Sequence, residues 1–304
     1  MAYQFSPQDL LQIEEHGLTP EQIQTQIDRF HEGFPRLQLD GPATLSRGII
    51  RLSEDELEAL QKEYDASSAS CTKFVPASGA ATRLFKRLYA HLDKPTQGNP
   101  LKASLAHYPF APMVADFLAG SGQQVDELEE KGDYAPIVRA IVDPQALGLA
   151  VRPKALIPFH RQEDGTTRTP IEEHLVEGAL YARRQDGTVH IHFTVSPQHE
   201  ASIRAHAMAV VSSLEQRYGV KYHLGFSLQS PSTDTIAARL DGSPYRDTAG
   251  RFVFRPAGHG ALLENLSVLE GELVFIKNID NVAPDRLKAQ EATGSLQHAG
   301  RAGW

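Results

Sequence analysis

A strand pattern that runs directly into a loop of small residues and then into a helix constrains this chain more than any other feature. Residues 72–75 read Thr-Lys-Phe-Val, which suits a strand, and residues 76–83 read Pro-Ala-Ser-Gly-Ala-Ala-Thr-Arg. Apolar residues then recur at helical spacing, as Leu84, Phe85, Leu88, Tyr89 and Leu92. The order of strand, small-residue loop and helix is typical of an α/β fold.

The rest of the chain repeats this alternation. In the strand expected at 189–195, apolar Val189, Ile191, Phe193 and Val195 alternate with polar residues, and a helix is expected at 197–217. Further strands are expected at 221–228, 235–238, 251–255 and 272–277. Strands that alternate with helices predict an α/β fold with a mostly parallel, mixed sheet.

Helix-start signals and composition divide the chain around this core. Capping patterns that begin at Ser6, Thr19 and Ser53 predict a helical N-terminal extension over residues 1–70. We expect an α/β domain at 71–288, with a helical insertion at about 93–145. Residues 289–304 are rich in Ala and Gly without periodicity, so a frayed or truncated tail is expected there.

Charge and composition exclude several classes of protein. The formal net charge is −8, which disfavours nucleic-acid partners and anionic membranes while leaving room for a local basic pocket. No apolar run approaches the length of a membrane helix, and residues 1–29 do not resemble a signal peptide, so a cytoplasmic protein is expected. The single cysteine, Cys71, cannot form an internal disulfide and is expected to be a core residue.

Two segments favour a site for phosphate groups. The loop at 76–83 lets backbone N–H groups approach an anion at a helix start, and Arg83 adds a planar cation. Lys154 lies between Pro153 and Pro158 beside an apolar run, where it can hold a phosphate as a point charge. A tight turn and a solvated lysine are the structural alternatives. The loop is neither a Walker P-loop nor a G-x-G-x-x-G loop.

Three later segments follow expected strands. Gln229 can pair with a base edge through its amide, and the Gly258-His259-Gly260 turn lets the backbone lie against a ring or ribose. Asp280 follows an apolar strand pattern. Because ligands bind beyond the carboxyl ends of strands in open α/β sheets, Asp280 is in position to hold Mg²⁺.

These motifs, in this order, resemble the UDP-sugar pyrophosphorylases over roughly residues 72–285. They comprise the loop at 76–84, the Pro-Lys-Ala-Leu-Ile step at 153–157, a Phe-x-x-Gln-x-x-Pro segment, the Gly-His-Gly turn and a strand that ends in Asn-x-Asp-Asn. The whole chain resembles more closely a bacterial family of domains of unknown function, number 4301, which is grouped with the nucleotidyltransferases.

The resemblance implies a three-layer α/β/α, GT-A-like nucleotidyltransferase fold. It also implies that a nucleoside triphosphate, with UTP as the expected one, reacts with a sugar 1-phosphate in the presence of Mg²⁺ to give a nucleotide sugar and pyrophosphate. Three residues take catalytic roles by this resemblance, with Asp280 as the metal ligand: Arg83, Lys154 and Asp280. The nucleotide is expected to contact Ala77, Ser78, Gly79, Ala80, Thr82, Gln229, Gly258, His259 and Gly260.

Other functions stay open at this point. Alanine and serine replace glycines that the family usually carries in the loop, which leaves room for a non-catalytic nucleotide-sugar or sugar-phosphate binding protein. A glycosyltransferase-like enzyme is a further alternative. His190 and His192 share one face of a strand and can ligate a metal if a third group joins them. The chain has neither the H-E-x-x-H spacing nor a G-x-S-x-G segment, so zincins and the common serine hydrolases are excluded.

Overall fold

A computed structural model describes residues 3–79, 81, 84–94 and 98–300 of the chain. It divides into two compact units. The first contains residues 1–54 and 229–268, and the second contains residues 55–228 and 269–304. Each unit is therefore formed by two separate stretches of the chain.

The second unit is built on a parallel four-stranded sheet whose order is β5-β4-β1-β8. Its strands are β1 (Cys71–Pro76), β4 (Thr188–Val195), β5 (Lys221–Leu228) and β8 (Leu273–Ile276). All six residues of β1 are buried, as expected for a central strand, while β4 has the buried and half-buried alternation that its sequence predicts. The structure thus confirms an α/β fold with a parallel central sheet.

Two helices cover one face of this sheet, and a third packs against the first of them. Helix α8 (Pro170–Tyr181) packs on β4, α9 (Glu200–Tyr218) packs on β5, and α11 (Asp285–Gly300) packs on α8. The core between sheet and helices contains Val75, Ile171, Leu175, Ile191, Phe193 and Ile203, all of them buried. Lys73 lies on the same face of β1 as Val75, so its side chain enters this layer.

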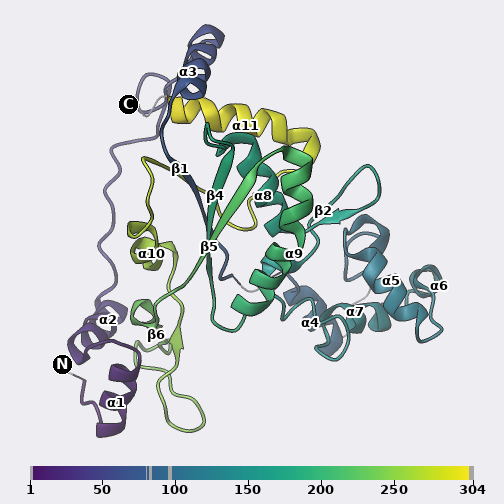
Figure 1. Ribbon diagram of the computed structural model, residues 1–304. Coiled ribbons are helices and arrows are strands. Elements are labelled where there is room, and N and C mark those ends of the chain that lie inside the picture. Colours follow the sequence, from purple (N-terminus) through teal and green to yellow (C-terminus); the bar gives the residue numbers. More distant parts are fainter. Residues whose placement is uncertain (1–2, 80, 82–83, 95–97, 301–304) are drawn as a thin grey trace. The chain divides into compact units, whose positions relative to one another are not determined.

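Helices α4 to α7 form a group of their own beside the sheet (Figure 1). They are α4 (Lys86–Asp93), α5 (Ala111–Ala119), α6 (Val125–Lys131) and α7 (Ala135–Val142). Their shared core includes Leu88, Val114, Ile137 and Ile141. This group corresponds to the expected helical insertion, but it starts earlier because α4 belongs to it. The small two-stranded sheet of β2 (His160–Arg161) and β3 (Thr167–Arg168) leads from this group into α8.

The first unit combines α1 (Pro7–Glu15) and α2 (Pro20–Glu32) with the short strands β6 (Thr235–Ile236) and β7 (Phe254–Arg255). Both helices begin with capping boxes, at Thr19 as the sequence predicts and at Ser6, where the sequence predicts the cap hydroxyl alone. Its core contains Ile13, Leu18, Ile23, Ile27, Ile236 and Phe252. The buried Asp9 carboxylate lies 2.8 Å from the guanidinium of Arg246 and ties the two stretches of chain together. The unit also contains α10 (Leu263–Ser267).

Two boundaries differ from those that the sequence predicts. The expected N-terminal extension divides near residue 54, and α3 (Glu54–Ala66) lies almost entirely in the second unit. The tail expected at 289–304 is helical as far as Gly300, and both Lys288 and Ala292 of α11 are buried. Polar contacts to α8 hold α11 in place. Such contacts leave no apolar periodicity in the sequence, so the sequence pattern did not predict this helix.

Within the part of the chain that the structure describes, no helix has both the length and the apolar character that spanning a membrane requires.

Candidate functional site

The order of the strands identifies where a ligand can bind. We call the side formed by the carboxyl ends of the parallel strands the edge of the sheet. The chain passes from β1 to β4 and then to β5 in one direction, and β8 joins on the other side of β1. The order therefore reverses between β1 and β8. In open parallel sheets the two loops that leave such a pair of strands separate, and the crevice at their carboxyl ends is where ligands bind.

The loop after β1 presents its backbone at this edge. The Ala77 N–H donates to the Thr194 carbonyl at 2.8 Å, so the start of the loop is fixed to the end of β4. Ser78 is half-buried and Gly79 is exposed. Apart from its two chain neighbours, no described residue has an atom within 4 Å of the place where a Cβ atom of Gly79 would be. The described structure therefore leaves the Gly79 backbone room for the close approach of a ligand.

Lys154 joins this loop from a distant part of the sequence. Its backbone N–H donates to the Gly79 carbonyl at 3.3 Å, at the start of a 3₁₀ turn over Lys154–Leu156. Its Nζ atom lies 2.6 Å from a carboxylate oxygen of Asp280. The Lys154 side chain is 22% exposed and that of Asp280 is 41% exposed, so a ligand can reach both.

Asp280 stands in the turn that follows β8. The N–H of Ile279 donates to the Pro76 carbonyl at 3.1 Å, and the Ile279 side chain is buried in the core with Val75. The N–H of Asn281 donates to the Asn278 carbonyl at 2.9 Å and closes the turn. The anchored Ile279 thus holds its neighbour Asp280 at the edge between β1 and β8. The structure brings Gly79, Lys154 and Asp280 together.

The charges of this site suit a ligand that carries both phosphate groups and a cation. A phosphate competes with Asp280 for the Lys154 ammonium, and a divalent cation competes with Lys154 for the Asp280 carboxylate. No group of three or more His, Cys, Asp or Glu side chains suited to a metal occurs among the described residues. Mg²⁺ commonly takes one or two carboxylates and completes its shell with phosphates and water. Asp280 could serve as the single carboxylate of such a site.

Two hydroxyl groups that the sequence predictions missed lie at the end of β4. Thr194 is fully buried, yet its Oγ1 atom has no hydrogen-bond partner in the described structure, and the same holds for the buried Oγ atom of Ser196. Ala77 of the small-residue loop is bonded to the backbone of Thr194. Unpaired buried hydroxyls cost free energy, so both are candidates for contact with a ligand or an ordered water. Their place at the end of an alternating strand and directly after it is the signal that could have found them.

The remaining predicted site residues lie outside the described part of the chain or in the first unit. Ala80, Thr82 and Arg83 lie outside the described residues. Gln229, Gly258, His259 and Gly260 belong to the first unit, whereas the loop after β1, Lys154 and Asp280 belong to the second.

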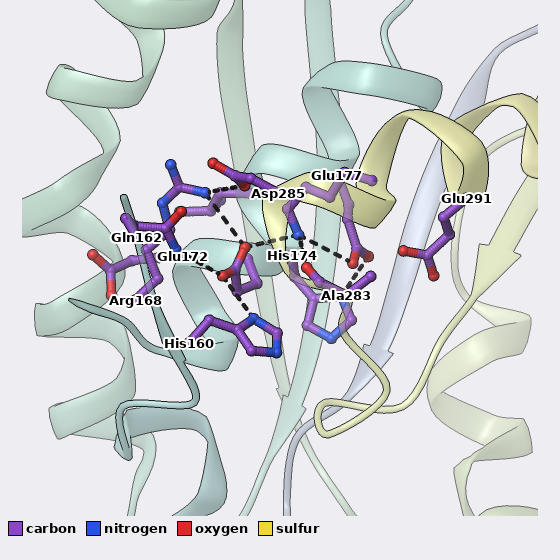
Figure 2. A network of polar contacts seen from close by, with 12 residues as sticks. His160, Gln162, Arg168, Glu172, His174, Glu177, Ala283, Asp285 and Glu291 are labelled. Carbon is purple, nitrogen blue, oxygen red and sulfur yellow. Dashed lines mark hydrogen bonds and ion pairs between the residues drawn. The ribbon is translucent and has the colours of Figure 1, made fainter. Parts of the chain in front are cut away.

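A network of charged side chains surrounds α8 in the second unit (Figure 2). Its centre is formed by Glu173 and Glu177 of α8, whose side chains are 0% and 1% exposed. A carboxylate oxygen of Glu177 lies 2.8 Å from the Lys73 ammonium and 3.0 Å from the Lys277 ammonium. Glu173 lies 2.7 Å from the Lys288 ammonium. The network therefore joins β1, the end of β8 and α11 to one side of α8.

The charges within the network balance. Besides Glu173 and Glu177 it contains two further carboxylates, since Asp285 lies 2.6 Å from Arg168 and Glu291 pairs with Lys277. Four carboxylates thus face four cations: Lys73, Arg168, Lys277 and Lys288. His160 adds a contact of 2.9 Å to Glu173. Asp285 and Glu291 are partly exposed, but the other members are buried, and a neutralised set of this kind is suited to holding elements in place.

Burial and neighbouring charges set the protonation of this network. Burial alone would raise the pKa of Glu177, but Lys73, His174 and Lys277 outweigh it and lower the pKa to about 2. Burial lowers the pKa of Lys73 to about 8, although Glu177 opposes the shift. Burial and the Lys73 charge lower the pKa of His174 well below its ordinary value. His174 is therefore neutral at pH 7.

His174 connects the network to the turn that carries Asp280. Its Nε2 atom lies 3.1 Å from the Asn278 carbonyl oxygen, an acceptor, so the ring carries its proton on Nε2 and donates it. Lys277, which precedes Asn278, is held by Glu177 from the same helix. The two residues that lead into Ile279 and Asp280 are thus both fixed by α8. Acidic residues at helical spacing on an otherwise apolar helix, as at Glu173 and Glu177, are the signal for this network.

The contacts of His190 and His192 are not those of metal ligands. His190 stacks on His223 with ring centroids 4.6 Å apart, and the Nε2 atom of His192 lies 2.8 Å from the Ser227 hydroxyl. Cys71 is buried, with its sulfur 3.3 Å from the Tyr64 hydroxyl, and burial raises the pKa of its thiol. A buried thiol of raised pKa is a poor nucleophile.

Comparison with known proteins yields one match. A family model described as a domain of unknown function (DUF4301) covers residues 6–299 of the chain. No curated protein and no solved structure matches it.

Proposed function

The chain belongs to the DUF4301 family, and we propose that it is a nucleotidyltransferase that joins a nucleoside triphosphate to a sugar 1-phosphate. The observation that supports this proposal most strongly is the meeting of Gly79, Lys154 and Asp280 at the reversal point of the parallel sheet. An open backbone turn, a cation and a carboxylate are the groups that nucleotide phosphates with Mg²⁺ require. We propose in addition that the α/β fold is a GT-A-like nucleotidyltransferase fold.

The proposed reaction needs positioning and charge neutralisation more than acid–base chemistry. An oxygen of the sugar phosphate forms a bond to the α-phosphorus of the nucleotide, and the bond from that phosphorus to the bridging oxygen breaks. Pyrophosphate leaves with the electron pair. Lys154 would orient the phosphates, and Arg83 would stabilise the leaving group. Mg²⁺, held by Asp280 and the phosphates together, would neutralise charge on the triphosphate.

A screen of nucleoside triphosphates against sugar 1-phosphates with Mg²⁺, read as pyrophosphate release, tests this proposal. We expect turnover with UTP, and a loss on the order of 10²-fold or more in Lys154→Ala and in Asp280→Asn. Lys221→Ala is a matched control, because Lys221 also pairs with a carboxylate, that of Glu215 at 2.9 Å, but stands at the amino end of β5. Turnover that is equal in the wild type and both site variants would refute the assignment.

One observation favours a second candidate, a protein that binds nucleotide sugars or sugar phosphates without turnover. Asp280 is already neutralised by Lys154 at 2.6 Å, and no group of three or more His, Cys, Asp or Glu side chains suited to a metal occurs among the described residues. Thermal stabilisation by a UDP-sugar without pyrophosphate exchange would select this candidate. Release of UDP would instead indicate a glycosyltransferase-like enzyme.

A further inference from the structure

A cavity of about 420 Å³ lies in the second unit, next to the candidate site. Its size is within the range of small-molecule pockets. The walls are mostly apolar and include Phe85, Leu101, Tyr108, Phe110, Ile157 and Phe159. We call it the aromatic pocket. It is separate from the buried charge network, whose residues do not line it.

The two chain segments of the candidate site both continue into the wall of the aromatic pocket. Lys154 and Gly79 are hydrogen-bonded to each other through their backbones. Ile157 follows Lys154 by three residues and Leu84 follows Gly79 by five, and both line the pocket. The aromatic pocket and the phosphate-facing edge of the sheet are therefore neighbours.

The described residues that line the aromatic pocket include few polar groups. The charged ones among them are Arg87 and Lys102, and both are cations. The Tyr108 hydroxyl already donates to the Leu101 carbonyl. A sugar placed among these walls would leave its hydroxyl groups without partners, which costs free energy for each one. The lining instead suits a ligand with an apolar body and a negative charge.

The backbone at Lys102 supports a functional position for its ammonium group. Lys102 has φ 70°, the one positive value among the described non-glycine residues. Asn99 holds this conformation, because its side chain donates to the Ala103 carbonyl and accepts from the Leu101 N–H, both at 2.8 Å. A left-handed lysine costs free energy, and such strain tends to persist where the side chain has a task.

We propose that the aromatic pocket binds a small organic anion, with an aromatic or branched aliphatic body inside the cavity and a carboxylate or phosphate at Lys102 and Arg87. The proposal does not depend on nucleotidyl transfer. It concerns a second ligand beside the nucleotide site, whether that ligand is a substrate or a regulator.

Calorimetry on the full-length protein with matched probes tests this. Phenylbutyrate and phenyl phosphate carry the proposed features, phenylbutanol lacks the charge, and gluconate lacks the apolar body. We expect one of the two aromatic anions to bind at one site per chain, with a dissociation constant on the order of 1 mM or tighter. Phenylbutanol should bind at least about fivefold more weakly, and gluconate should not bind, because the charge and the apolar body both contribute.

Two variants locate the site. Lys102→Ala should weaken binding of the anion by about fivefold or more, and Leu84→Glu should abolish it by placing a negative charge on an exposed part of the wall. Lys131→Ala and Met208→Glu make the same changes at exposed positions outside the pocket and should leave binding unchanged. Equal affinity for phenylbutyrate and phenylbutanol, binding that ignores Lys102→Ala and Leu84→Glu, or no binding of either aromatic anion would overturn the proposal.

Discussion

The Lys154 ammonium lies 2.6 Å from the Asp280 carboxylate although 126 residues separate them in the sequence. The Lys73–Glu177 pair has nearly the same separation, 2.8 Å, but is fully buried. An accessible pair can exchange its partner for a ligand, whereas a buried pair cannot do so without exposing a charge to an apolar medium. The two pairs should therefore differ in what they contribute to stability and to function.

We expect Lys154→Ala and Asp280→Asn to change the free energy of unfolding by less than about 1 kcal/mol, because partly exposed ion pairs contribute little. The same variants should lose nucleotide binding, measured by calorimetry with UTP and Mg²⁺. A loss of several kcal/mol of stability in either variant would instead make this pair structural. The Lys221→Ala protein serves again as the control.

Glu177→Gln should destabilise the protein by about 3–5 kcal/mol, because it leaves Lys73 buried beside a neutral side chain. Urea denaturation at pH 7 measures this. Glu127→Gln removes the carboxylate of an exposed pair with Lys131 and should stay within about 0.5 kcal/mol of the wild type. If Glu177→Gln and Glu127→Gln lower the free energy of unfolding by similar amounts, the buried network does not stabilise the fold.

The network also predicts how stability depends on pH. The pKa of Glu177 is lowered from its ordinary 4.5 to about 2, so the unfolded chain takes up this proton first as the pH falls. The contribution of Glu177 is complete above about pH 4.5 and is lost towards pH 2. His174 has its pKa lowered from 6.5, mainly by burial, so the unfolded chain also protonates first here. Stability should therefore decline as the pH falls below 6.5.

His174→Gln isolates the contribution of His174 to the pH dependence of stability. Glutamine can still donate to the Asn278 carbonyl, but it does not titrate. Urea denaturation between pH 7.5 and pH 5 should show a shallower decline in this variant, by at most about 1.4 kcal/mol per pH unit. The exposed residue His107 provides the control, as His107→Gln. An unchanged decline in His174→Gln would mean that His174 is not buried as a neutral ring.

Local patterns predicted several strands of the sheet, but not every expected strand belongs to it. Residues of β4 alternate because one face of the strand packs on α8, and β5 has the bounds that its sequence predicts. The strands expected at 235–238 and 251–255 instead contribute β6 and β7 to the small antiparallel sheet of the first unit. The rule that ligands bind at the carboxyl ends of parallel strands indicated Asp280, but it did not predict that Lys154, in a 3₁₀ turn between α7 and β2, meets it.

Contacts between distant residues determine what the sequence did not reveal. Lys73 stands in a strand pattern, and nothing near it in the chain shows that Glu177 neutralises it. Likewise, α11 lacks a periodic apolar face, and ion pairs from Lys288 to Glu173 and from Glu291 to Lys277 hold it on the unit. The division into two units was also missed, because each is made of segments that only the folded chain brings together.

Replacing glycine by alanine should destabilise the protein at position 178 and stabilise it at position 294. A Cβ atom on Gly178 of α8 would lie 2.7 Å from the Ile191 Cδ1 atom and 3.0 Å from the Val189 Cγ1 atom, both in the buried core. Gly178→Ala should therefore push α8 away from β4 and cost about 1–3 kcal/mol. A Cβ atom on Gly294 of α11 would meet no atom of the described residues within 4 Å beyond the nearby backbone of its own helix, so Gly294→Ala should stabilise the helix by up to about 1 kcal/mol. Thermal unfolding of the two variants beside the wild type measures both effects, and a stabilising Gly178→Ala would show that α8 does not pack against β4 at this closeness.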